Sequence, residues 1–154
     1  MSLSLICKVD ILKIQDPFFE QLRSSVFGKL QQLWNKQGSS SVSSDIIMRF
    51  LGRLFVLKND TRWNSEYSAV SCLVRLLKKS YRQMKKLFEK FNIDFISPHE
   101  EKILKEYVRV TKSVCEALDV LQGEKNVGMG FLLPTLSVLK NKLKALKDDA
   151  SIIP

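Results

Sequence analysis

Cysteine, proline and glycine are all scarce in this 154-residue chain, which contains three, four and six of them. All-β domains normally use more glycine and proline at their turns, so the shortage favours helices. The cysteines are odd in number and far apart, at positions 7, 72 and 115. This pattern argues against a disulfide framework and indicates a reducing, intracellular compartment.

Long apolar runs are also missing. No stretch approaches the roughly 18 residues that span a bilayer, and the apolar opening of the chain is interrupted by Lys8 and Asp10. We therefore expect no transmembrane helix, no signal peptide and no membrane partner.

Sequence motifs of catalytic and metal sites are absent as well. The chain has no Cys-x-x-Cys, phosphate-loop, dinucleotide-binding or Gly-x-Ser-x-Gly pattern. Its one histidine, His99, stands beside Glu100 and Glu101 and is separated from Cys115 by about 24 Å along an expected helix. We therefore assign no catalytic residue, metal ligand, cofactor or small-molecule substrate, and expect that the chain is not an enzyme.

Apolar and basic residues are what the chain does have. With 45% hydrophobic residues it has enough apolar side chains for one globular domain. Its net charge of +9 favours a polyanionic partner such as nucleic acid.

Apolar residues recur at helical spacing in five segments. Good boundary signals accompany them, the strongest being the capping box formed by Ser97 and Glu100 around Pro98. Ser44 is the expected cap of the second segment, which should end near Gly52, and Leu54 to Leu57 is expected to be an irregular or extended link. The predicted helices are 17–36, 44–52, 64–91, 98–122 and 133–147.

These segments predict an all-α fold. The three long helices 64–91, 98–122 and 133–147 should form an antiparallel bundle packed through Leu77, Leu118 and Leu139, with the first two helices covering its flank. We divide the chain into an N-terminal segment (1–15), flanking helices and a link (16–62) and the bundle (63–154). Residues 3–11 alternate like a strand, whose sheet would lie elsewhere.

Basic residues are concentrated on the predicted helix 64–91. Seven lie between Arg75 and Lys90, against the single acid Glu89. At 100° per residue, five of them form a stripe opposite the apolar seam. A solvated helix face would also be polar, but such faces usually intersperse acids, so phosphate-backbone contact is a second interpretation. The stripe consists of Arg75, Lys79, Arg82, Lys86 and Lys90.

Arg62 and Trp63 lie side by side at the start of the same predicted helix, among small hydrogen-bonding residues. A guanidinium and an indole together could grip a phosphate and stack on a base. Trp63 could equally close the end of the bundle core.

The segment from Asp60 to Tyr67, with the sequence DTRWNSEY, resembles the middle of hAT-type transposases and their domesticated descendants. The preceding LWNKQ, a serine-rich loop and DII, and the later FLLPTL and LKNKL, are similar to that family too. The resemblance covers most of the chain, about residues 3–146, and implies a piece of an RNase H-like core interrupted by a helical insertion.

The resemblance also implies a function. The family cuts and joins DNA with two aspartates, one glutamate and a divalent metal such as Mg²⁺, and these acids would lie outside this chain. Arg62 and Trp63 match the family's pair beside the active site, where the tryptophan stacks on distorted DNA. The implied location is nuclear.

The sequence therefore leaves two functional hypotheses. The first is a non-catalytic transposase-derived fragment that contacts DNA weakly, without sequence preference and in a salt-dependent way. The alternative is a helical interaction or oligomerisation module without a DNA role, which could self-associate and should expose an apolar patch.

Overall fold

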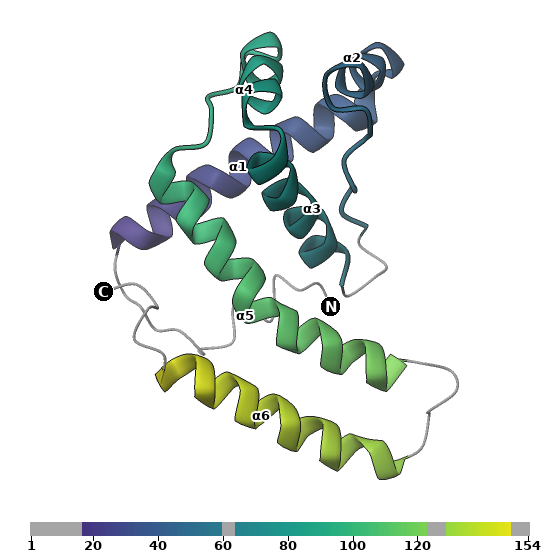
Figure 1. Ribbon diagram of the computed structural model, residues 1–154, viewed down its shortest axis with the longest axis vertical. Helices are drawn as coiled ribbons and strands as arrows, with labels where there is room; N and C mark the ends of the chain where they lie inside the picture. Colours follow the sequence, from purple (N-terminus) through teal and green to yellow (C-terminus); the bar gives the residue numbers. More distant parts are fainter. Residues whose placement is uncertain (1–16, 60–63, 123–128, 149–154) are drawn as a thin grey trace.

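The computed structural model describes residues 17–59, 64–122 and 129–148, and this part of the chain is helical with no β-strand (Figure 1). The predicted all-α fold class is confirmed. The alternating segment 3–11 lies outside the described residues. The elements are α1 (Pro17–Ser39), α2 (Ser41–Leu51), α3 (Ser65–Lys79), α4 (Tyr81–Lys90), α5 (Pro98–Gln122), the 3-10 turn η2 (Met129–Phe131) and α6 (Leu132–Asp148).

One hydrophobic core is formed by the four helices α1, α2, α3 and α4, together with the first half of α5 and the links between them. The helix α1 belongs to this core instead of covering its flank, because three of its side chains are fully buried. Large side chains of α3, α4 and α5 complete the centre. Side chains with no solvent exposure include Val26, Leu30, Leu33, Leu73, Met84, Phe88 and Leu104.

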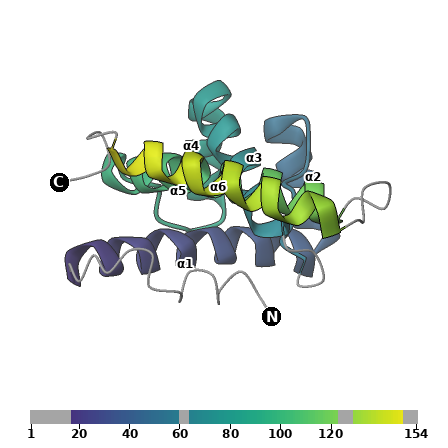
Figure 2. The ribbon, with the colours of Figure 1, turned by 90° about the horizontal axis from the view of Figure 1, so that it is seen from below.

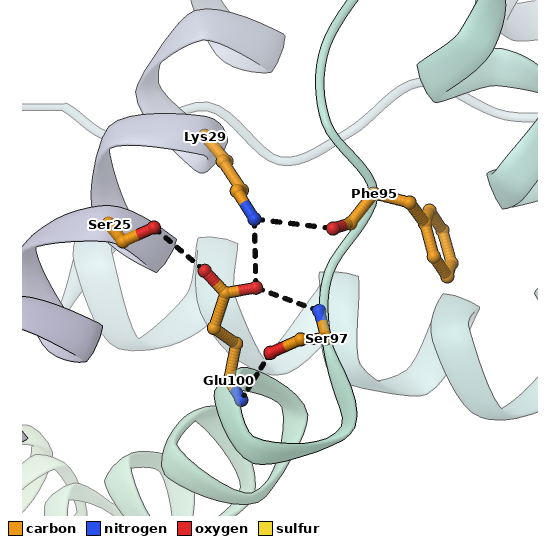
Figure 3. A network of polar contacts seen from close by, with 5 residues as sticks. All are labelled: Ser25, Lys29, Phe95, Ser97 and Glu100. Carbon is orange, nitrogen blue, oxygen red and sulfur yellow. Dashed lines mark hydrogen bonds and ion pairs between the residues drawn. The ribbon is translucent and has the colours of Figure 1, made fainter.

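The start of α5 is fixed by the predicted capping box, which is confirmed. The Ser97 amide donates to the Glu100 carboxylate at 2.7 Å, and the Glu100 amide donates to the Ser97 hydroxyl at 3.2 Å. Two side chains of α1 reach the same carboxylate, Lys29 at 2.9 Å and Ser25 at 2.9 Å (Figure 3). Lys29 also donates to the carbonyl of Phe95, so a single buried glutamate connects α1, α5 and the link before α5.

The predicted single helix 64–91 is wrong, because the chain breaks at Ser80 into α3 and α4. Ser80 has φ −134° and ψ 43°, outside the helical region. Backbone bonds from Ser80 to Leu76 and from Met84 to Ser80 remain on either side of the break. The apolar spacing continues in phase across it, so periodicity alone does not reveal it. Tyr81, the first residue of α4, is 51% exposed.

The boundary between α1 and α2 also differs from the prediction. The helix α1 continues to Ser39, and the cap of α2 is Ser40, whose hydroxyl accepts from the Ser43 amide, and not Ser44. The Ser44 hydroxyl donates instead to the Gln37 carbonyl. Adjacent serines compete for the same capping role, so sequence did not decide between them. The predicted end at Gly52 is confirmed by its left-handed φ of 68°.

The link after α2 is irregular, as predicted. Gln37 holds this link through two hydrogen bonds with the backbone of Phe55. The Gln37 side-chain nitrogen donates to the Phe55 carbonyl at 3.0 Å, and the Phe55 backbone amide donates to the Gln37 side-chain oxygen at 2.8 Å. These bonds allow Phe55 to be buried in the core although no regular backbone structure surrounds it.

The helix α6 forms an antiparallel hairpin with the second half of α5, away from α1 and α2 (Figures 1 and 2). It begins one residue before the predicted Leu133. The expected bundle core is not formed: Leu77 is buried, but Leu118 and Leu139 are only half-buried. Three of the four α5 residues that line the gap to α6, Ser113, Glu116 and Ala117, are polar or small, so this half of α5 offers α6 little apolar surface.

Candidate nucleic-acid interface

Seven basic side chains surround the junction of α3 and α4, and all seven are exposed. We call them the basic surface. Its members are Arg75, Lys78 and Lys79 on α3, and Arg82, Lys85, Lys86 and Lys90 on α4.

Buried residues on the opposite sides of the two helices hold the basic surface outward. The helix α3 buries Leu73 and Leu77, and α4 buries Met84, Leu87 and Phe88. These side chains are part of the core shared with α1. The orientation of the cations is therefore set by hydrophobic packing and does not depend on their own contacts.

The charge of the basic surface is not neutralised within the described part of the chain. None of its seven cations forms an ion pair there, and the nearby acid Glu89 is exposed. Arg75 donates its Nε to the Ser71 carbonyl at 3.4 Å, a long contact that leaves its charge uncompensated. A surface of this kind attracts polyanions.

The break at Ser80 divides the expected five-residue stripe into two tracks. Arg75 and Lys79 belong to α3, whereas Arg82, Lys86 and Lys90 belong to α4, and Figure 1 shows the two helices meeting at an angle. All five residues are exposed, as predicted, but they do not follow one straight helix. A ligand that contacts both tracks has to span a bend in the protein surface.

Arg62 and Trp63 lie outside the described residues, so neither the DNA contact nor the core position of Trp63 is tested. The residues around them are held in place: the Ser65 hydroxyl donates to the Asn59 carbonyl. Asn64 occupies the cap position of α3 without capping it, because its side-chain amide donates to the Cys115 carbonyl and to the Asp119 carboxylate of α5.

Asn64, next to Trp63 in the sequence, precedes the first turn of α3, and Lys79 of the basic surface ends its last turn. The 15-residue helix between these two points is about 22 Å long. A duplex with a helical repeat of about 34 Å is long enough to span this distance.

The two described cysteines are buried and unlinked. Burial, followed by the charges of Asp119 and Glu116, raises the pKa of Cys115 to about 11, so this thiol stays protonated at neutral pH. His99 is exposed in the first turn of α5. Within the described ranges, no three His, Cys, Asp or Glu side chains are grouped so that they could hold a metal ion.

A second set of exposed cations lies on α6, where the sequence analysis placed only an apolar seam. Lys140, Lys144 and Lys147 are all exposed, and the sequence from Leu132 to Lys147 contains no acidic residue. The absence of interspersed acids, which identified the basic surface, is the signal that could have identified this one too.

Comparison with known proteins identifies no relative: no family model, curated protein or solved structure matches the chain. In the described part of the chain, no helix has the length and apolar character needed to cross a bilayer.

Proposed function

We propose that this chain is a non-catalytic helical fragment of a hAT-type transposase-like protein, and that its basic surface contacts the DNA phosphate backbone. The observation that carries the proposal is the group of seven exposed cations with one nearby acid and no ion pair among the described residues. Arg62 and Trp63 are proposed as additional contacts on the basis of the motif alone. The nuclear location follows from the same resemblance.

The physical chemistry of the basic surface sets the expected strength and selectivity. Cations distributed over two short helices can neutralise about three to five phosphates, each contributing about −0.9 to the slope of log affinity against log salt concentration. Such contacts read no base edges, so binding should be weak and indifferent to sequence. The bend at Ser80 favours DNA that is itself bent or flexible, because both tracks can then be contacted together.

The test is fluorescence anisotropy of a labelled 20-base-pair duplex, titrated with the full chain at several salt concentrations. The variant with Arg75, Lys79, Arg82 and Lys86 changed to Gln should bind at least tenfold more weakly and show a flatter salt dependence. A matched control changes Lys36, Arg49, Lys102 and Lys105 to Gln, which removes the same charge from exposed positions elsewhere. An equal loss of DNA affinity in both variants would mean that binding depends on the net charge alone and not on the basic surface, and would refute the proposal.

Trp63→Ala separates the two roles considered for that residue. As a DNA contact, Trp63 should contribute more to binding single-stranded or distorted DNA than to binding duplex, because stacking on an unpaired base is worth about 1–3 kcal/mol. As a core residue, it should lower the thermal midpoint without a DNA-specific effect.

The alternative function, a protein-interaction module, has an observation of its own. Exposed apolar side chains gather on η2 and α6: Phe131 is 50% exposed and Leu133 is 74% exposed. Absence of DNA binding by the unmodified chain would make this the leading hypothesis.

A further inference from the structure

One flank of α6 combines exposed apolar residues with lysines and has no acid. At 100° per residue, seven positions fall within an arc of about 120° on the helix. Leu143 among them is half-buried, and the side chains of the other six are exposed. We call them the α6 flank: Leu132, Leu133, Leu136, Lys140, Lys144 and Lys147.

The two kinds of residue are separated along the helix axis. The leucines occupy the first two turns, where Leu133 is 74%, Leu136 45% and Leu132 42% exposed. The lysines occupy the last two turns and form no ion pair with any described residue. Lys142, on the side of α6 that faces α5, is by contrast paired with Glu116 at 2.8 Å.

We propose that the α6 flank binds an amphipathic helix of a partner protein that is acidic in its N-terminal turns and apolar in its C-terminal turns. This partner helix lies antiparallel to α6, which places its acids over the lysines and its apolar side chains over the leucines. Acidic residues are also favoured in the first turns of a helix by the helix dipole, so this direction suits the partner itself. Binding of an amphipathic helix through regularly spaced anchors is a common recognition mode.

Charge distinguishes this partner from the other possible occupants of the α6 flank. A second copy of the chain carries the same net charge of +9, and antiparallel pairing of two α6 helices would place leucines against lysines. A membrane surface favours a helix whose exposed apolar residues extend along its whole length beneath a polar face, whereas on the α6 flank the exposed apolar residues stop after two turns. The proposal is independent of DNA binding, because the basic surface belongs to α3 and α4.

The test uses a fluorescein-labelled synthetic 16-residue helical peptide with Glu on one face of its first two turns and Leu on the same face of its last two turns. The full chain should bind this peptide more tightly than a peptide of the same composition in which the acidic and apolar halves are exchanged. Equal affinity for the two peptides would overturn the proposed orientation and with it the proposal.

Charge exchange makes the test specific to the α6 flank. Changing Lys140, Lys144 and Lys147 to Glu should weaken binding at least tenfold, and a peptide with Lys in place of Glu should restore it. Lys36→Glu, Lys102→Glu and Lys105→Glu together form the matched control and should leave binding within about twofold. The double variant Leu133→Ser and Leu136→Ser tests the apolar half and should also weaken peptide binding. If that variant folds poorly, the charge-exchange experiment still tests the proposal, because it leaves the leucines unchanged.

Alternative occupants are tested directly with the same chain. Concentration-dependent dimerisation in analytical ultracentrifugation that Leu133→Ser abolishes would show that a second copy covers the flank, and would overturn the proposal. So would binding to phosphatidylserine vesicles or duplex DNA that the α6 lysine variant loses while peptide affinity stays unchanged. Loss of peptide binding with duplex affinity retained supports the proposal without bearing on the function of α3 and α4.

Discussion

The two halves of the molecule differ in how completely their side chains are packed. In the half formed by the four helices α1 to α4, large residues such as Leu30, Leu73 and Phe88 are fully buried. In the hairpin of α5 and α6, no described side chain of α6 is buried, and a cavity of about 240 Å³ lies between the two helices. An amphipathic sequence therefore yields a fully buried core in one region and a partly covered helix face in the other.

This difference teaches where the functions of the chain can be located. The two exposed charged surfaces lie on helices that are held by different contacts. The helices α3 and α4 are fixed by the hydrophobic core, whereas α6 is held by half-buried side chains and by the exposed Lys142–Glu116 ion pair. Exposed pairs contribute little to stability. The position of the basic surface is therefore set by the core, whereas the position of α6 depends mainly on its packing against α5.

Phe88→Ala should have the largest effect on stability. The side chain is fully buried and makes an edge-to-face contact with Phe95 at 5.3 Å. Removing it should lower the free energy of unfolding by about 3–5 kcal/mol, measured by urea denaturation with circular dichroism. Leu143→Ala, at a half-buried position of α6, is the comparison and should cost about 1 kcal/mol. Equal losses would contradict the distinction between the two halves.

Glu100→Ala should have the next largest effect. It removes the common partner of Lys29, Ser25 and the Ser97 amide, leaving a largely buried ammonium without its counter-charge. The expected loss is about 3 kcal/mol in the same denaturation experiment. Glu101→Ala, which removes only an i,i+4 pair with Lys105, should cost less than about 0.5 kcal/mol. A loss at Glu101 as large as that at Glu100 would count against the special role of this network.

The same carboxylate should make stability depend on acid pH. Burial alone would raise the pKa of Glu100, but hydrogen bonds from the Ser97 amide, Lys29 and Ser25 outweigh it and lower the pKa below 4.5. In the unfolded chain this carboxylate therefore takes up its proton at a higher pH than in the folded protein. Its contribution to stability is complete above about pH 4.5 and is lost as pH falls through the folded pKa, by at most about 1.4 kcal/mol per unit.

Glu100→Gln is the variant that checks this pH dependence. Its urea unfolding, followed between pH 3 and 6, should show a smaller loss of stability than that of the unmodified chain. An identical slope in the two proteins would assign the acid sensitivity to other carboxylates.

Local signals in the sequence predicted local structure well. Ser97, Pro98 and Glu100 gave the start of α5 correctly because a capping box involves residues three apart. The contacts of Lys29 and Ser25 with Glu100 could not be predicted, since more than 70 residues separate them from it. Ser80 was missed because the apolar period continues through the break.

The exposed surfaces were predicted only in part. Periodicity correctly assigned the outward direction of the basic surface, because each of its helices has one apolar side that had to face the core. The same reasoning failed for α6. A period identifies the apolar side of a helix, but how much of that side is covered depends on the residues it meets, here the polar Ser113 and Glu116 and the small Ala117 of α5.

The smallest expected effect is a gain in stability when the basic surface loses charge. Arg75 and Lys79, and likewise Arg82 and Lys86, are like charges four residues apart on one helix, and each such pair destabilises by about 0.2–0.5 kcal/mol. Changing all four to Gln should therefore raise the free energy of unfolding by about 0.5–1 kcal/mol at low salt, and this gain should disappear in 0.5 M salt as the repulsion is screened.

Adding duplex DNA should reverse this difference in stability, so that the unmodified chain becomes more stable than the four-Gln variant. Phosphates that bind the folded unmodified chain stabilise it by mass action and relieve the repulsion between its cations, so its thermal midpoint should rise with DNA concentration. The four-Gln variant should show little change. A loss of more than about 1 kcal/mol in the variant without DNA would instead mean that these side chains support the core, and their exposed positions would then have no separate role in binding.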